Sequence, residues 1–143
     1  MKNIIEVQNI TKYFDDLTAL DDLSLKVCEG EIYGLLGSNG AGKSTTINIL
    51  LGFLQPEMGK ATINGIDAVT NSNQSRKYIG YIPENVSLYG YLSGVENLDY
   101  FCKLAGKSHT EDQLRELLRE SGLDDEAHNK RIKTYSKGMR QKV

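Results

Sequence analysis

Hydrophobic and polar residues alternate near the start of the chain, and this alternation predicts two β-strands. Residues 4–10 show some alternation. Residues 20–27 alternate more regularly, with Leu23, Leu25 and Val27 on one face. An alternating pattern indicates strands that bury one side only, as in an antiparallel sheet.

A third apolar segment differs because it is almost continuously hydrophobic. Residues 32–36 follow an expected turn at residues 29–31 and predict a short strand buried on both faces. Gly-rich sequence comes next, and residues 43–51 then carry apolar residues at helical spacing. Residues 61–65 predict a strand that ends in a turn, and residues 78–82 predict another strand. The order of strand, Gly-rich turn and helix is the one that a phosphate-binding loop requires.

After the last expected strand, capping signals predict helices. Ser93 and Glu96 form a capping box, in which the hydroxyl and the carboxylate each satisfy an unpaired backbone N–H group. Thr110 and Gln113 form a second capping box, and Gly122 is a candidate C-cap of that second helix. Strands and one helix are therefore expected in the first part of the chain, and helices in the second.

Composition and charge are those of an ordinary globular protein. The 143 residues are 39% hydrophobic and 25% charged with a formal net charge of -2, so no positive field indicates a nucleic-acid partner. No stretch approaches the ~20 apolar residues of a membrane span, and the N-terminus lacks the apolar core of a signal peptide. Cys28 and Cys102 are expected to be free thiols. We expect a cytoplasmic chain whose membrane role, if any, comes through a partner.

Residues 37–44, Gly-Ser-Asn-Gly-Ala-Gly-Lys-Ser, fit the phosphate-loop pattern G-x-x-x-x-G-K-[ST]. The glycines permit positive φ and bring backbone N–H groups close to an anion, and the helix that follows points its positive end at the phosphates. Lys43 is expected to reach the β- and γ-phosphate oxygens as a catalytic residue, and the Ser44 hydroxyl to bind Mg²⁺. We expect the nucleotide phosphates to contact Ser38, Asn39, Gly40, Ala41, Gly42, Lys43, Ser44 and Thr45.

A phosphate loop alone does not separate a kinase, a GTPase, a DNA-repair ATPase and a transporter motor. Three further segments do so, at residues 11–21, 79–84 and 135–141. In this order around the phosphate loop, they resemble the nucleotide-binding subunit of ABC transporters. The resemblance covers the whole chain and makes ATP and Mg²⁺ the expected cofactors.

The resemblance implies that an aromatic residue in the early loop stacks on the adenine. Spacing from the Thr-Ala-Leu-Asp segment at residues 18–21 favours Phe14, with Tyr13 as the second choice. Stacking needs only a π-face, so a Phe suffices. The alternative is that the aromatic ring belongs to the core.

Glu84 stands where the family usually carries the Gln of its Q-loop, a residue that senses Mg²⁺ and the attacking water and contacts the membrane partner. Some exporter-like subfamilies carry Glu at this place, so the resemblance implies a catalytic and metal-binding role for Glu84. A carboxylate accepts hydrogen bonds from water, but it cannot donate as an amide does. The alternative is an ordinary surface Glu after a strand.

Residues 135–141, Tyr-Ser-Lys-Gly-Met-Arg-Gln, resemble the family's signature motif, usually Leu-Ser-Gly-Gly-Gln. Ser136 and Gly138 match directly, whereas Lys137 replaces a Gly and Met139 replaces the Gln. In the family this segment caps a helix and clamps the γ-phosphate held by the opposing subunit, through the Ser hydroxyl and backbone N–H groups. Lys137 either adds positive charge near that phosphate or points to solvent.

The resemblance implies an α/β fold of the P-loop NTPase class, a truncated ABC-type nucleotide-binding domain. Residues 1–84 would form the antiparallel β subdomain and part of the nucleotide-binding core, and residues 85–143 the helical subdomain up to the signature motif. The implied partners are a transmembrane permease subunit and a second nucleotide-binding subunit, which place the chain at the inner face of the cell membrane. The variant signature with Glu84 most resembles exporters of drugs, antibiotics or polysaccharides, by analogy alone.

Later elements of the family are not found in these residues. They are an Mg²⁺-associated Asp that ends an apolar strand, the adjacent Glu that polarises water, and a His that contacts the γ-phosphate. Because positioning and electrostatics supply nearly all the catalysis of phosphoryl transfer, we expect this chain to bind ATP but hydrolyse it very poorly or not at all. We expect a truncated part of a longer protein, with unpaired strand edges and exposed apolar faces.

Other functions are compatible with parts of the pattern. A soluble ABC-type ATPase that acts on ribosomes or other macromolecules is the main alternative. A DNA-repair ATPase would carry long coiled-coil sequence between the phosphate loop and the signature, and none is present. A small-molecule kinase predicts neither Phe14, nor Glu84, nor the signature. A natural regulator that binds ATP without hydrolysis is the last alternative.

Overall fold

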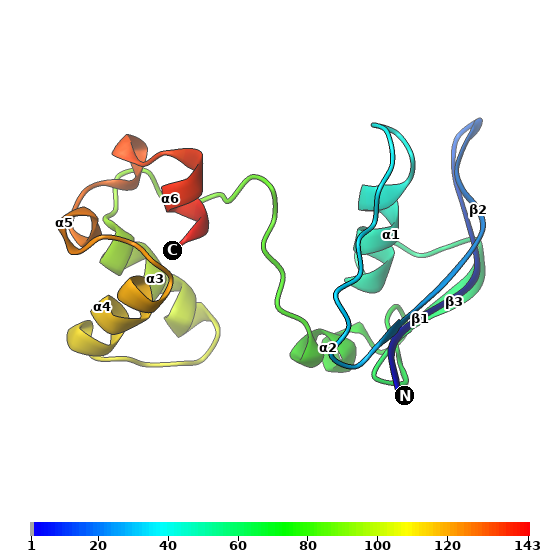
Figure 1. Cartoon of the computed structure of the whole chain (residues 1–143), viewed down its shortest axis with the longest axis horizontal. Helices are drawn as coiled ribbons and strands as arrows, with labels where there is room; N and C mark the ends of the chain where they lie inside the picture. The colour runs from blue at the N-terminus through cyan, green and yellow to red at the C-terminus, as the bar shows by residue number, and fades with distance from the viewer. Residues whose placement is uncertain (1) are drawn as a thin grey trace. The chain divides into compact units, whose positions relative to one another are not determined.

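The computed structural model describes residues 2–143, which divide into two compact units, Met1–Gly80 and Tyr81–Val143 (Figure 1). Each unit has a hydrophobic core of its own. The expected division of roles after residue 84 stays a prediction.

A four-stranded antiparallel sheet forms the base of the first unit. Its strands are β1 (Asn3–Phe14), β2 (Leu17–Cys28), β3 (Met58–Ile63) and β4 (Ile66–Asp67), in the order β2-β1-β3-β4. The first two expected strands are confirmed and are longer than the alternation indicated. The third starts earlier than expected, at Met58.

Helix α1 (Lys43–Leu50) packs against β2 and β3, which confirms the helix expected after the Gly-rich turn. Its C-terminal end is closed by Gly52 at φ +70°, whose N–H donates to the Ile49 carbonyl at 2.9 Å. The core between sheet and helix contains Val7, Ile10, Leu20, Ile49, Ala61, Ile63 and Ala68. This core holds the start of α1, and with it the Gly-rich loop, against the sheet.

The prediction of a strand at residues 32–36 is wrong. These residues are extended without strand pairing, and the side chains of Ile32 and Leu36 are almost fully exposed. A pocket of about 280 Å³ lies between this segment, β2 and α1. A strand needs neighbours that accept and donate its backbone hydrogen bonds, and no described residue supplies one here.

The strand expected at residues 78–82 is wrong for the same reason. A short helix α2 (Ser72–Ser75) continues into the 3₁₀-helix η1 (Arg76–Tyr78), and the chain then runs extended without a pairing strand in the described residues. Tyr81 and Ile82 are exposed. The expectation of exposed apolar surface is therefore confirmed in both segments.

The second unit is helical, as the capping signals predicted. It contains α3 (Gly94–Leu104), α4 (Glu111–Glu120), α5 (Asp125–His128), the 3₁₀-helix η2 (Ile132–Thr134) and α6 (Lys137–Gln141). Its core residues are Val95, Leu114, Leu118, Leu123, Ala127, Ile132 and Tyr135. No helix within residues 2–143 has the length and apolar character needed to cross a membrane.

Both capping boxes are confirmed by their hydrogen bonds. The Ser93 N–H donates to the Glu96 carboxylate at 2.7 Å, and the Glu96 N–H donates to the Ser93 hydroxyl at 3.3 Å. Thr110 and Gln113 make the same pair of bonds at the start of α4. At its end, Gly122 at φ +80° donates to Arg119, as the expected terminating glycine.

Candidate functional site

The Gly-rich loop has a backbone that only glycine accommodates at Gly42. This residue caps α1 at φ +79°, and a Cβ there would lie 2.5 Å from the Leu20 side chain and 2.6 Å from the Ala19 carbonyl oxygen. Gly40 also has a positive φ, of +86°, but no atom lies within 4 Å of where its Cβ would be. The loop is therefore pressed against β2 at Gly42 and open to solvent at Gly40.

Helix α1 presents unpaired backbone donors toward this loop. The first helical bond runs from the Thr46 N–H to the Gly42 carbonyl at 2.9 Å, so the N–H groups of residues 43–45 belong to the first turn that a helix leaves unpaired. The Thr46 hydroxyl also donates to Gly42, at 3.0 Å. The first turn contains no acidic residue that would repel an anion.

The Lys43 side chain folds back over the loop. Its ammonium group donates to the carbonyl oxygens of Gly37 at 2.7 Å and Ser38 at 2.6 Å. These bonds hold a positive charge beside the free N–H groups, as an anion site requires. The donors and the charge fit a polyphosphate group, with Lys43 and the first turn of α1 as its ligands.

Phe14 lies at the end of β1 with 42% of its surface exposed, and Tyr13 is equally exposed at 43%. Exposure therefore does not distinguish the two, and both lie outside the core. The Lys12 ammonium lies 5.3 Å from the centroid of the Phe14 ring, a distance at which cation and π-face attract. This contact with Lys12 is the feature that favours Phe14 as the candidate stacking ring.

Sequence reasoning missed the residue that holds this end of β1. Glu57 accepts from the Lys12 ammonium at 2.7 Å and from the Tyr13 backbone N–H at 3.0 Å. The hydrogen bond from Lys12 is the main cause that lowers the pKa of Glu57. The pair is separated by 45 residues, so no local signal in the sequence could have revealed it.

Glu84 and Lys137 lie together in the second unit, with 3.0 Å between the carboxylate and the ammonium. Both are residues at which the chain departs from the family's usual pattern, a Gln and a Gly. The side chains are exposed, and such a pair contributes at most about 1 kcal/mol. The Lys137 side chain lies at the surface and pairs with Glu84, and its positive charge near a phosphate stays a prediction.

Ser136 caps the short helix α6, as the sequence suggested. Its hydroxyl accepts from the Met139 N–H at 3.2 Å. Gly138 lies in the first turn, with no atom within 4 Å of where its Cβ would be. The start of α6 is therefore open above Gly138, and Ser136 and Gly138 lie on the same helical turn.

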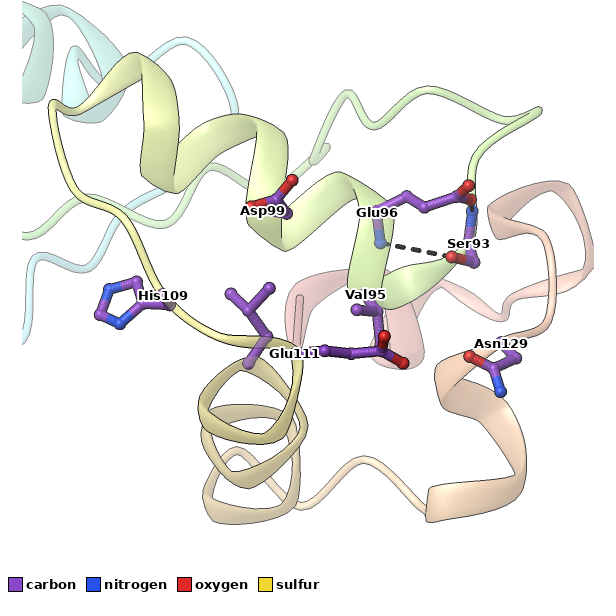
Figure 2. Close-up of a pocket in the computed structure, with 8 residues that line it drawn as sticks. Ser93, Val95, Glu96, Asp99, His109, Glu111 and Asn129 are labelled. Carbon is purple, nitrogen blue, oxygen red and sulfur yellow. Dashed lines mark hydrogen bonds between the residues drawn. The ribbon is translucent and has the colours of Figure 1, made fainter.

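The predicted site residues fall in both units. Phe14 and residues 38–45 belong to the first, and Glu84, Ser136 and Gly138 belong to the second. A pocket of about 520 Å³ in the second unit contains none of them (Figure 2). Its acidic groups have local partners: Asp99 pairs with Lys103, Glu111 with Arg115, and Glu96 with the Ser93 N–H.

The fold is that of a P-loop NTPase. A solved structure of an ATP-binding subunit of an ABC transporter superimposes with a TM-score of 0.78 at 35% identity, over 97% of this chain and 58% of that chain. The family model described as ABC transporter matches residues 20–143. The chain belongs to the ABC transporter family.

Two curated relatives align along the full length of the chain. It is 41% identical over 143 residues to YhcH of Bacillus subtilis (strain 168), an uncharacterised ABC transporter ATP-binding protein, and covers 46% of it. It is 36% identical over 143 residues to BcrA of Bacillus licheniformis, a bacitracin transport ATP-binding protein, and also covers 46% of it. The chain thus spans about half the length of these relatives.

Proposed function

We propose that this chain is the ATP-binding part of a transport subunit and that the loop at residues 37–44 holds the phosphates. One observation carries this proposal. The Lys43 ammonium and the unpaired N–H groups of the first turn of α1 lie beside the same open loop. Positive charge and free donors at a helix N-terminus stabilise phosphate.

Each residue of the first unit has a distinct role in this proposal. Lys43 exchanges its two carbonyl partners for β- and γ-phosphate oxygens, which accept more strongly because they are charged. The Ser44 hydroxyl would hold Mg²⁺, which would neutralise negative charge on the phosphates. Phe14 supplies the face on which adenine stacks, with Lys12 held on the ring by Glu57. The other contacts come from Ser38, Asn39, Gly40, Ala41, Gly42 and Thr45.

The second unit supplies the groups that respond to ATP. Glu84 is proposed to approach Mg²⁺ and the attacking water. Ser136 and Gly138, at the open start of α6, are proposed to clamp the γ-phosphate held by a second nucleotide-binding subunit. A transmembrane permease is the second proposed partner, and it would hold the chain at the inner face of the membrane.

We further propose that transport is export. The similarity to BcrA, a bacitracin transport ATP-binding protein, agrees with a drug or antibiotic as substrate. Glu84 at the position of the Q-loop Gln supports the same subfamily by resemblance, and Lys137 forms an ion pair with it.

Binding of a fluorescent ATP analogue with Mg²⁺ tests the proposal, with phosphate release followed in the same sample. We expect saturable binding by the chain, a loss of at least about tenfold in affinity for Lys43→Ala because one charged hydrogen-bond donor is removed, and little or no phosphate release. Lys60→Ala, a change at an exposed lysine on β3, is the matched control and should bind normally. A folded chain that does not bind would overturn the proposal.

A further inference from the structure

Tyr135 comes directly before the helix cap Ser136, yet it belongs to the core. It is 4% exposed and packs with Val95 and Leu118 in the core of the second unit. Its hydroxyl donates to the Ala127 carbonyl oxygen at 2.5 Å. An apolar side chain could fill this position but could not donate a hydrogen bond. The hydroxyl therefore links residue 135 to α5 in addition to filling space in the core.

The same hydroxyl meets the start of α3. A Cβ at Gly94, the first residue of that helix, would lie 2.5 Å from the Tyr135 hydroxyl oxygen. Burial raises the pKa of the Tyr135 phenol, and a hydrogen bond from the Gly94 backbone acts in the opposite direction. The hydroxyl therefore lies between the Ala127 carbonyl on α5 and the Gly94 backbone at the start of α3.

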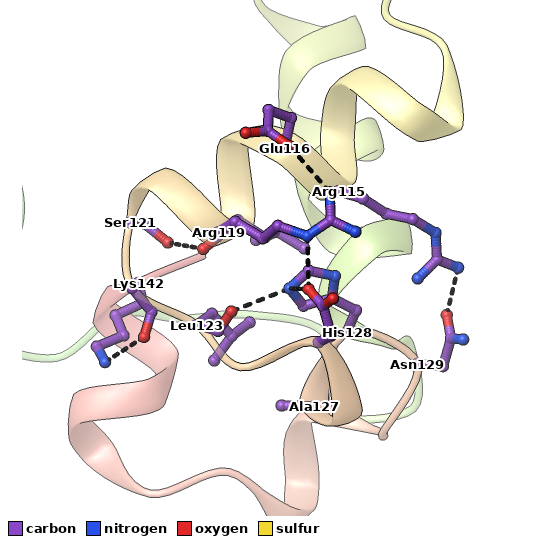
Figure 3. A network of polar contacts seen from close by, with 12 residues as sticks. Arg115, Glu116, Arg119, Ser121, Leu123, Ala127, His128, Asn129 and Lys142 are labelled. Atoms are coloured by element: carbon purple, nitrogen blue, oxygen red, sulfur yellow. Dashed lines mark hydrogen bonds and ion pairs between the residues drawn. The ribbon is translucent and has the colours of Figure 1, made fainter.

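The stability of helix α6 depends on contacts made by the residues that flank it. It has only five residues, Lys137–Gln141, and helices of this length are not stable by themselves. Its far end is held by Lys142, whose ammonium donates to the Gly122 carbonyl at 2.6 Å (Figure 3). Its near end begins at Ser136, one residue after Tyr135. The direction of α6 is therefore set from both sides by residues that flank it.

We propose that Tyr135 is a positioning residue for the signature segment: its hydroxyl fixes Ser136 and the first turn of α6 relative to α3 and α5. The inference rests on the proposed role of Ser136 and Gly138 as a clamp on a second subunit's nucleotide. A clamp needs its donors within a narrow geometry. The hydroxyl supplies this precision because it is buried and its bonds have fixed directions.

Tyr135→Phe tests the inference, with Tyr91→Phe as the matched control at a 69% exposed tyrosine. Removal of the hydroxyl takes one hydrogen bond from the Ala127 carbonyl, which still accepts from the Lys130 N–H at 2.8 Å, and it frees the Tyr135 ring from α5. We expect backbone amides of residues 136–141 to exchange with solvent on the order of tenfold faster, while amides of α4 keep their rates. The Met139 N–H, which donates to Ser136, is the most informative probe. Equal acceleration in α4 and α6, or none, would show that the hydroxyl serves general packing and would overturn the inference.

A second experiment uses light scattering to measure how MgATP drives the association of two copies of the chain. Tyr135→Phe should bind ATP with unchanged affinity but need about five- to tenfold more chain for association. Normal association by this variant overturns the inference alone. An ATP-bound wild-type chain that does not associate overturns the clamp role of Ser136, and the inference with it.

Gly94→Ala is the second variant if Tyr135→Phe does not fold, because the added methyl group would overlap the Tyr135 hydroxyl and force the rigid phenol away from the start of α3. Local acceleration of exchange in residues 136–141 would support the inference, and an unchanged α6 would overturn it.

Discussion

The two units differ in how their backbone groups find hydrogen-bond partners. In the second unit, the unpaired backbone groups at the ends of α3 and α4 find partners in residues next to each helix. In α3 these partners are Ser93 and Glu96 at the start and Gly106 at the end. Residues 32–36 of the first unit, and residues 79–82 at the boundary between the units in the sequence, run extended without a pairing strand among the described residues. A helix satisfies its backbone from within, whereas a strand depends on another segment. Stability in the second unit is therefore local, and in the first it depends on the sheet β1–β4 and on α1.

The proposed phosphate site lies where this difference matters most. The loop joins the unpaired segment at residues 32–36 to α1, so only its second half is anchored. Gly42 packs against β2, and the core residue Ile49 holds the helix behind it. Nucleotide binding would add contacts to the half that lacks them, and binding to the native state alone raises stability.

Leu118→Ala gives the largest expected effect. Leu118 is 1% exposed, and its truncation should cost about 2–5 kcal/mol in the second unit, since a cavity is left in the core. Amide exchange in mild denaturant should show lost protection in α3 and α4 and unchanged protection in β1 and β3. Ile49→Ala, at an equally buried site, should give the reverse pattern. Loss of protection in both units from either change would contradict two separate cores.

Gly42→Ala should destabilise the first unit by about 2–4 kcal/mol. About 1–2 kcal/mol comes from the positive φ and the rest from overlap with Leu20 and Ala19. Gly40 also has a positive φ, but an added Cβ there would overlap no atom. Gly40→Ala should therefore lose only about 1–2 kcal/mol, the part that comes from the positive φ. Urea unfolding measures both variants. Equal losses would show that packing of the loop on β2 contributes nothing.

The second unit should lose stability in acid through Glu96. The hydrogen bond from the Ser93 N–H holds the pKa of Glu96 below its usual value of 4.5. Because this carboxyl has a lower pKa when folded, its contribution is complete above about pH 4.5 and disappears as pH falls through the folded pKa. The Arg119 guanidinium lowers the pKa of Asp125 in the same direction.

Urea unfolding between neutral pH and pH 3 measures this dependence in Glu96→Gln. The amide keeps the capping bond from Ser93 but does not titrate, so the pH slope should become shallower. Ser93→Ala should instead cost about 1 kcal/mol at every pH. An unchanged pH slope in Glu96→Gln would show that Glu96 is not the group that causes the loss of stability in acid.

Leu36→Asp should have the smallest effect on stability, within about 0.5 kcal/mol, because the side chain is 92% exposed. It should also reduce aggregation, measured by light scattering, since it breaks an exposed apolar segment. Leu20→Asp, at a buried position of the same unit, should unfold it. A comparable loss from Leu36→Asp would mean that residues 32–36 are packed after all.

Sequence reasoning succeeded where structure is locally determined. The capping boxes at Ser93 and Thr110 were found because their partners lie three residues away. It failed for residues 32–36, because an apolar run indicates burial without saying which strand will lie beside it. The second strand ran longer than its pattern for the same reason, since pairing with β1 extends it to Leu17.

The candidate site shows the same limit. The phosphate loop is a continuous pattern, so residues 37–44 could be identified from the sequence alone. The pairs Lys12–Glu57 and Glu84–Lys137 span 45 and 53 residues and depend on how the chain folds. The role of Tyr135 also gave no signal in the sequence, because its buried hydroxyl bonds to Ala127 on α5, eight residues earlier in the chain.

Chemical-shift mapping of the isotope-labelled chain with MgATP tests the central claim most directly. We expect the largest changes at residues 38–45 and at Phe14, and we expect Lys43→Ala to remove them. Changes that spare the loop and gather around the pocket of Figure 2 would contradict it.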